Sequence, residues 1–144
     1  MVVPSVFWDT NLFIYLIEER PRELHESVVR AREQMVSRGD ELVTSALTLG
    51  EIMVQPIRAG KAEMAQRYAD LISAGAVIVA LDAAAARKYG EIRARFQSVK
   101  PPDAVQLACA ASHGVSLFLT NDRRLERVRV AGVEKVAALT DWAA

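Results

Sequence analysis

The feature that most constrains the fold lies near the start of the chain, where a short apolar run is followed by a carboxylate and a helix start. Residues 6–8 are apolar and rich in residue types that favour β structure, so they predict a buried strand. Asp9 follows at once, and Thr10 and Asn11 are residue types that favour helix N-termini. In an open parallel sheet, ligands bind beyond the carboxyl ends of the strands, close to helix N-termini. We therefore expect Asp9 at such a place.

The rest of the chain predicts strands and helices in alternation. Further strands are expected over residues 42–45, 76–81 and 115–120, with a last edge strand or irregular tail over 133–139. The continuous apolar run 76–81 predicts a strand buried on both faces. Helical spacing of apolar residues predicts helices over about 12–18, 24–37, 46–59, 64–75, 83–96, 103–111 and 123–128, and Pro56 is expected to kink or shorten the third.

This alternation indicates an α/β fold with a parallel sheet covered by helices on both faces. We expect about five short strands and seven helices. A chain of 144 residues with 51% hydrophobic content fits one compact domain, so residues 1–144 are interpreted as a single domain.

Composition sets further expectations about partners and surroundings. The 18 basic and 18 acidic residues give zero net charge, which argues against nucleic-acid binding by bulk charge but allows a local basic patch. A single cysteine, Cys109, permits no intrachain disulfide, and its apolar helical setting predicts a core position. No basic segment precedes the first apolar run, and no run approaches the ~20 residues of a membrane span. We expect a soluble cytoplasmic protein without a membrane partner.

Four acids occupy positions from which they could take part in catalysis or metal binding: Asp9, Glu51, Asp103 and Asp122. Asp9 and Asp122 follow predicted strands, whereas Glu51 and Asp103 lie near the starts of predicted helices. If the four converge, their mutual repulsion, roughly 4 kcal/mol for a pair ~4 Å apart at an effective dielectric of 20, requires protons or cations. Hard oxygen ligands favour Mg²⁺ or Mn²⁺, and such a site can activate water and hold a phosphate oxygen.

Each acid also has a purely structural explanation. Asp9 and Asp103 are good helix caps, Asp122 suits a turn, and Glu51 suits a solvated helix face. Asp82 resembles Asp122 in following a strand, but we interpret it as a helix N-cap. The two histidines are isolated, and the sequence has no glycine-rich nucleotide loop or serine-hydrolase elbow.

Four short motifs, in this order and spacing, carry a resemblance to a known family. They are residues 9–11 (DTN) after a strand, residues 44–51 (TSALTLGE), residues 102–104 (PDA) and residues 119–122 (LTND). Together they resemble the PIN-domain family, most closely the VapC-type toxins of bacterial toxin–antitoxin pairs, from Val6 to the strand after Gly132. In the fourth motif Arg123, Arg124 and Leu125 follow, where the family often has an aromatic residue.

The resemblance implies a three-layer α/β/α sandwich and a Mg²⁺- or Mn²⁺-dependent endoribonuclease. It implies that Asp9 and Asp103 are the main metal ligands, that Glu51 binds directly or through water, and that Asp122 completes the cluster. By the same resemblance, five polar residues orient the carboxylates or waters: Thr10, Asn11, Ser45, Thr120 and Asn121. An RNA substrate, a cognate antitoxin and a homodimer are the implied partners. Four basic side chains near the cluster are candidates to hold RNA: Arg95, Lys100, Arg123 and Arg124.

The sequence leaves three other functions to consider. A receiver-like phosphoacceptor domain also has parallel strands ending in acids and requires Mg²⁺, although no adjacent acid pair follows the first strand here. A phosphatase of the haloacid-dehalogenase type would require a second Asp where Asn11 stands. A PIN-like scaffold that binds RNA or protein without cleaving it is the remaining alternative.

Overall fold

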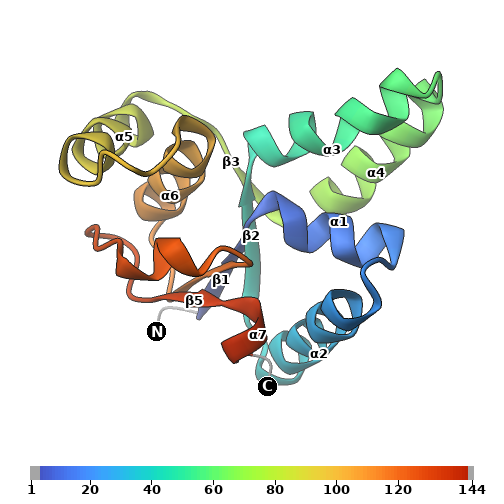
Figure 1. The fold of residues 1–144 in the computed structure, drawn as a ribbon, viewed down its shortest axis with the longest axis horizontal. Helices are drawn as coiled ribbons and strands as arrows, with labels where there is room; N and C mark the ends of the chain where they lie inside the picture. Colours follow the sequence, from blue (N-terminus) through green and yellow to red (C-terminus); the bar gives the residue numbers. More distant parts are fainter. Residues whose placement is uncertain (1–3, 143–144) are drawn as a thin grey trace.

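The computed structural model describes residues 4–142, which form a central five-stranded sheet with helices on both faces (Figure 1). The strands are β1 (Ser5–Trp8), β2 (Glu41–Ser45), β3 (Val77–Val79), β4 (Leu117–Thr120) and β5 (Val136–Ala138). Their order across the sheet is β3-β2-β1-β4-β5, and all four neighbouring pairs are parallel. The predicted α/β class and the parallel sheet are therefore confirmed.

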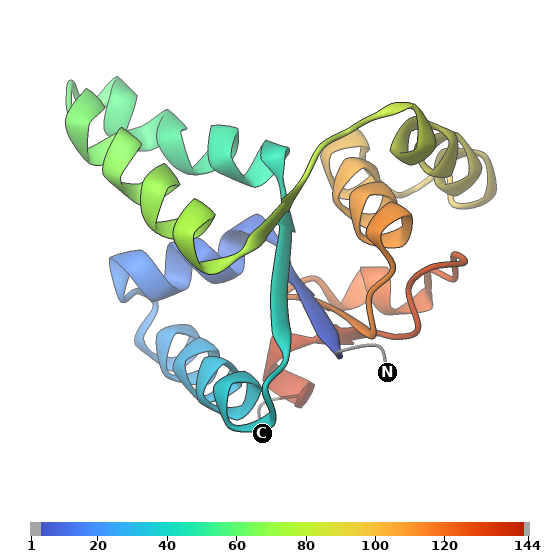
Figure 2. The same cartoon turned by 180° about the vertical axis from the view of Figure 1, so that it is seen from behind.

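Seven α-helices and one 3₁₀ helix connect and follow the strands. The helices are α1 (Thr10–Glu18), α2 (Arg22–Arg38), α3 (Ala46–Arg58), α4 (Ala62–Gly75), α5 (Ala83–Arg95), α6 (Pro101–His113), η1 (Arg123–Arg127) and α7 (Leu139–Trp142). Figures 1 and 2 show α1, α2, α3 and α4 on one side of the sheet and α5 and α6 on the other. No helix among residues 4–142 has the length and apolar character needed to cross a membrane.

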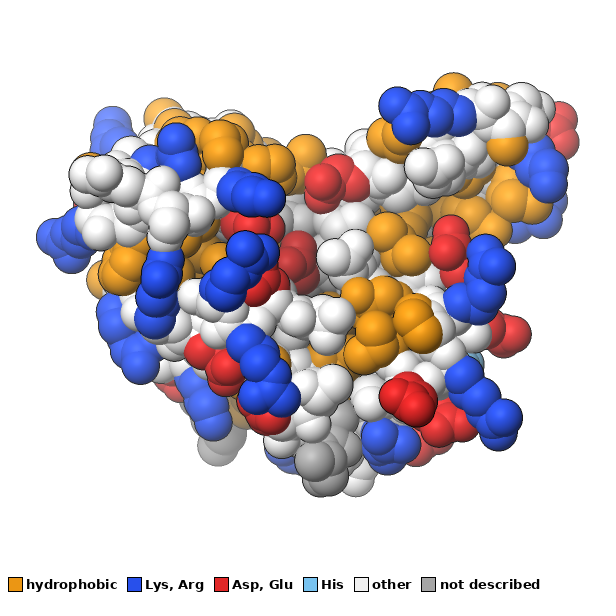
Figure 3. All heavy atoms as spheres, in the orientation of Figure 1, with side chains coloured by type: hydrophobic (Ala, Val, Ile, Leu, Met, Phe, Trp, Pro, Cys, Tyr) orange, Lys and Arg blue, Asp and Glu red, His pale blue; other side chains and the backbone are white. Residues whose placement is uncertain are grey.

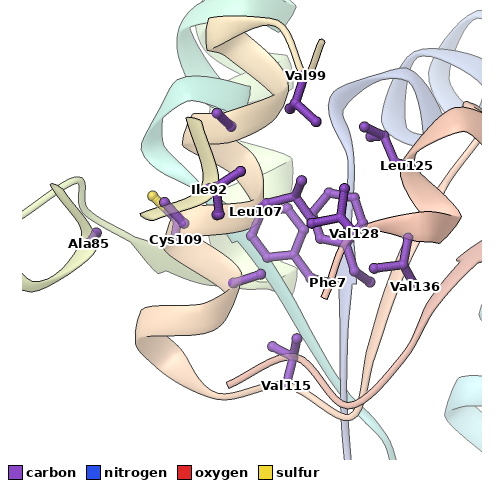
Figure 4. Packing of buried hydrophobic residues seen from close by; sticks show 14 of the residues in the cluster. Phe7, Ala85, Ile92, Val99, Leu107, Cys109, Val115, Leu125, Val128 and Val136 are labelled. Atoms are coloured by element: carbon purple, nitrogen blue, oxygen red, sulfur yellow. The ribbon is translucent and has the colours of Figure 1, made fainter. Parts of the chain in front are cut away.

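Alternation along β1 divides the core between the two faces of the sheet. Phe7 points to the α5–α6 side of the sheet (Figure 4). Its ring stacks on that of Phe118 at a centroid distance of 5.1 Å. Trp8 points to the other side and packs against Phe13 of α1. Cys109 belongs to the α5–α6 core, as predicted, and burial raises the pKa of its thiol to about 11.

Three details differ from the expectations. Val77 of β3 is 36% exposed because β3 is an edge strand, so this strand is not buried on both faces. Pro56 lies within the last turn of α3, and the helix continues past it to Arg58, so the proline does not end the helix at its own position. The last edge strand expected over residues 133–139 is β5, which is shorter than that range because α7 begins at Leu139.

The α3–α4 pair extends away from the rest of the molecule as a helical hairpin (Figures 1 and 2). Because all strands run in the same direction, Trp8, Ser45 and Thr120 end their strands at one edge of the sheet. This edge faces the hollow between the α3–α4 hairpin and the α5–α6 side.

Candidate metal centre

Asp9 stands directly beyond β1, the middle strand, and its position is fixed from several directions. Its backbone N–H donates to Leu119 O of β4 at 3.1 Å. Its Oδ1 accepts from the Thr10 backbone N–H at 2.9 Å, which makes it the N-cap of α1, and its Oδ2 accepts from Thr120 Oγ1 at 3.0 Å. Asp9 is thus both a helix cap and a carboxylate at the sheet edge, and the two interpretations of it do not exclude each other.

Glu51 and Asp103 reach the same hollow from other elements. Both residues line the depression that Asp9 borders, Glu51 from the second turn of α3 and Asp103 from the first turn of α6. The expectation that Asp103 opens its helix is corrected, since α6 begins at Pro101 with Lys100 as N-cap. Proline fits the first helical positions because their N–H groups have no intrahelical partner.

Asp122 lies at the edge of this group rather than at its centre. It caps η1 by accepting from the Arg124 backbone N–H at 3.0 Å, and it lines a neighbouring depression that shares Asp103 with the first. Figure 3 shows acidic side chains in the hollow and Lys and Arg side chains along its α5–α6 side. The four acids thus lie in two adjoining depressions, although Asp9 and Asp122 are 113 positions apart in sequence (122 − 9).

The acids affect one another electrostatically. Burial raises the pKa of Asp9 to about 6; hydrogen bonds from Thr120 and Thr10 oppose the rise, and the charges of Asp103 and Glu51 add to it. Burial also raises the pKa of Asp103, with a further contribution from Asp122, while Arg124 acts in the opposite direction. Proximity of like charges is what makes such a group of carboxylates favour a bound cation.

A buried polar network lies beneath the acids and holds Glu51 in place. Thr10 Oγ1 donates to Glu51 Oε1 at 2.6 Å. The Gln106 amide donates at 2.9 Å to both Thr10 Oγ1 and Thr48 Oγ1, and Ser45 Oγ donates to Gln106 Oε1. Thr44 Oγ1 lies 2.9 Å from Thr48 Oγ1 and from Trp8 O. This network joins β2, α1, α3 and α6 under the hollow.

Thr48 and Gln106 were not identified from the sequence. The signal for Gln106 was its spacing, because a residue three positions after Asp103 lies on the same helix face, and a glutamine in an otherwise apolar run requires buried partners. The sequence offers no comparable signal for Thr48, because its partner Thr44 belongs to β2 and the helix begins only at Ala46. Only a fold that brings α1, α3 and α6 together gives either residue its partners.

The five predicted supporting residues occupy different positions. Thr10 contacts Glu51, Thr120 contacts Asp9, and Ser45 contacts Gln106. Asn11 is exposed and lines the hollow, whereas Asn121 donates its amide to Tyr15 Oη at 3.0 Å. Among the candidate basic residues, Arg123 pairs with Asp141 at 2.8 Å, and Arg124 pairs with Asp122.

The chemistry of the donor set fits a hard divalent cation. All the candidate ligands are carboxylate oxygens, and within residues 4–142 no Lys, Arg or His forms an ion pair with Asp9, Glu51 or Asp103. In the described part of the chain no three His, Cys, Asp or Glu side chains are arranged so that they could hold an ion as they stand. Both Asp122 carboxylate oxygens contact Arg124, so Asp122 would have to leave this contact to reach a cation in the hollow.

Comparison with known proteins decides the family. The PIN-domain family model matches residues 6–131 of the chain. The chain belongs to the PIN-domain family. Among curated proteins no sequence matches it.

Solved structures with the same PIN fold include three VapBC proteins. A chain of VapBC2 from Rickettsia felis, bound to a DNA fragment from its promoter, has a TM-score of 0.74 and 18% identity over 93% of this chain and 98% of that chain. A chain of DNA-bound VapBC from Salmonella typhimurium has a TM-score of 0.72 and 23% identity, over 95% of this chain and 99% of that chain. A chain of VapBC-1 from nontypeable Haemophilus influenzae has a TM-score of 0.69 and 19% identity, over 94% of this chain and 98% of that chain. These likenesses establish the three-layer α/β/α fold of the PIN domain here.

Proposed function

We propose that this PIN-domain protein is a Mg²⁺- or Mn²⁺-dependent endoribonuclease that hydrolyses phosphodiester bonds in RNA. The observation that carries the proposal is the meeting of Asp9, Glu51 and Asp103 in one hollow, where none of the three forms an ion pair with a Lys, Arg or His among residues 4–142. Asp9 and Asp103 would be the main ligands, with Glu51 and Asp122 completing the set. When bound, the cation supplies an activated water and offsets charge on the phosphate.

The chain's own residues have the task of keeping the carboxylates ionised and oriented. Thr120 and the Thr10 backbone N–H hold the two oxygens of Asp9, and Thr10 holds Glu51. Ser45 acts through Gln106, which donates to Thr10. Asn11 borders the hollow and Asn121 braces Tyr15 of α1, so they support the site from its rim.

We also propose that the protein is the toxin of a toxin–antitoxin pair in the cytoplasm, with residues 1–144 forming a single PIN domain. The VapBC likenesses support an antitoxin partner. Exposed Val54, Ile57 and Leu71 on the α3–α4 hairpin give an apolar surface suited to a homodimer. Co-purification with the product of a neighbouring small reading frame tests the antitoxin, and light scattering of wild type and Ile57→Asp tests the dimer.

Of the alternatives, the receiver-like phosphoacceptor domain is excluded by strand order. Receiver-type sheets have the order 2-1-3-4-5, whereas this sheet is ordered β3-β2-β1-β4-β5. A PIN scaffold without activity differs from the proposed nuclease only in the outcome of an assay, so cleavage must be measured.

The deciding experiment maps cleavage sites in total RNA with Mn²⁺ and with a chelator, for wild type, Asp103→Asn and Asp82→Asn. Asp82 also follows a strand but caps α5 by accepting from the Ala85 N–H at 2.9 Å, so it is the matched control. We expect wild type and Asp82→Asn to cleave only with the cation. A pure, folded Asp103→Asn protein that still cleaves would refute the assignment.

A further inference from the structure

Asp122 differs from the other three acids because a guanidinium group occupies it. Arg124 Nε lies 2.9 Å from Asp122 Oδ1 and Arg124 Nη2 lies 2.8 Å from Oδ2, so the contact is bidentate. The Arg124 backbone N–H adds a third hydrogen bond at 3.0 Å. Asp9 and Glu51, by contrast, accept only from hydroxyl groups and a backbone N–H within the described residues.

The pair is exposed, so it can open without disturbing the fold. The Arg124 side chain is 75% exposed and the Asp122 side chain 27%. Because the guanidinium is largely exposed, water can solvate it when the pair opens, which lowers the cost of separating the two groups. The hydrogen bond that caps η1 runs from the Arg124 backbone N–H to Asp122 and does not involve the guanidinium. The start of η1 is therefore kept when the guanidinium leaves Asp122.

Arg124 also lies close to a second acid of the site, Asp103. It lines the second depression together with Lys100, Asp103 and Asp122, and its charge acts on Asp103 as well as on its partner. Lys and Arg side chains border the acidic hollow on this side (Figure 3). The planar guanidinium that fits a carboxylate with two hydrogen bonds fits a phosphate in the same way.

We propose that Arg124 is a phosphate-binding residue that Asp122 holds in reserve and that is released when a divalent cation binds the acids; this inference rests on the proposed function. Without the cation, Arg124 neutralises Asp122. With the cation in its place, Arg124 turns to a backbone phosphate of the RNA. Cation and RNA binding are therefore coupled, and thermodynamic linkage makes the coupling reciprocal.

The first test measures Mn²⁺ binding without RNA, from the electron paramagnetic resonance signal of free Mn²⁺. Arg124→Ala should bind Mn²⁺ roughly fivefold more tightly than wild type, a typical coupling factor, because Asp122 no longer has a competitor. The matched control is Arg123→Ala, which removes the same charge one position earlier, from a side chain 64% exposed and paired with Asp141. We expect the Mn²⁺ affinity of this control to equal that of wild type. We also expect Arg124→Ala to leave the Mn²⁺ affinity unchanged when Asp122→Asn is already present.

The second test follows binding of a fluorescent single-stranded RNA by anisotropy, with a chelator and with Mn²⁺, over times in which a gel shows the RNA intact. Mn²⁺ should tighten RNA binding by wild type roughly fivefold or more. In Arg124→Ala the tightening should be lost, while its RNA affinity with the chelator equals that of wild type. Equal tightening in the two proteins overturns the inference.

The tests separate this inference from the proposed function. A wild type that cleaves RNA, but whose Mn²⁺ affinity is unchanged by Arg124→Ala or rises equally in Arg123→Ala, overturns the inference alone. Tighter Mn²⁺ binding by Arg124→Ala in a protein that never cleaves RNA supports the exchange at Asp122 and overturns the endoribonuclease. A wild type that binds no Mn²⁺ overturns both.

Discussion

Thr120 Oγ1 donates to Asp9 Oδ2 at 3.0 Å, across 111 positions of sequence. The same oxygen accepts from the Asp122 backbone N–H at 3.1 Å, so one hydroxyl at the end of β4 connects two of the four acids. The contact stabilises the ionised form of Asp9, which is the form a cation requires.

Replacing Thr120 with valine should move the pH dependence of cation binding. Loss of the hydroxyl removes an interaction that lowers the pKa of Asp9, so the pKa rises further and less of the carboxylate is ionised at a given pH. The acidic limb of Mn²⁺ binding should shift to higher pH by up to about one unit for one hydrogen bond to a charged group. Thr120→Ser should restore the wild-type curve, and identical curves for valine and serine would contradict the role.

Asp9→Asn should stabilise the cation-free protein at neutral pH. Because the folded pKa of about 6 lies above the ordinary 3.8, the folded state binds more protons than the unfolded state between these values. Stability is therefore lost as pH rises through that window. The variant lacks this loss, so its free energy of unfolding should exceed that of wild type by near zero at pH 4 and by ~2–3 kcal/mol at pH 7.5. Urea unfolding in chelator measures it, and an advantage independent of pH would be evidence against the raised pKa.

Gln106→Leu should destabilise the protein by ~2–3 kcal/mol, since it leaves the buried hydroxyls of Thr10, Thr48 and Ser45 short of a partner. Gln66→Leu is the matched control, because Gln66 is an exposed glutamine on α4 whose amide donates to Asp70 Oδ1 at 2.9 Å. The control should stay within about 0.5 kcal/mol of wild type in urea unfolding. Similar losses in the two variants would show that the network does not have this role.

Gly132→Ala should be among the most destabilising small substitutions in the chain. A Cβ at Gly132 would lie 2.1 Å from the Ala111 carbonyl oxygen, and its φ of +104° is itself unfavourable for an L-residue. We expect a loss of more than about 3 kcal/mol, or no folded protein. Gly39→Ala, at φ +72° with open space around it, should cost only about 1 kcal/mol. Thermal unfolding compares the two, and equal losses would contradict the packing argument.

Local chemistry made part of this structure predictable. Asp9 and Asp82 cap their helices as expected because capping depends only on the next few residues. The buried strand over residues 6–8 follows from three consecutive apolar residues that no polar neighbour interrupts. The parallel sheet then follows, because strands separated by helices rarely pair in any other way.

Other features depend on contacts that the sequence does not display. Val77 belongs to an apolar run, but its exposure follows from the place of β3 at the end of the strand order. Gln106 is a single polar residue in a helix until α1 and α3 bring hydroxyls to it. The Arg124 contact is close in sequence, but the adjacent Arg123 pairs instead with Asp141, 18 positions away in sequence.

The central place of β1 in the strand order means that the four acids are not held equally firmly. Asp9 follows a strand with a neighbour on each side, so opening of either outer strand leaves it in place. Glu51 belongs to a hairpin that extends outward, and Asp122 to an exposed turn. Amide hydrogen exchange should therefore be slowest around Asp9 and faster around Asp122. A cleft built in this way has one wall anchored at the centre of the sheet, and we expect its other walls to open first.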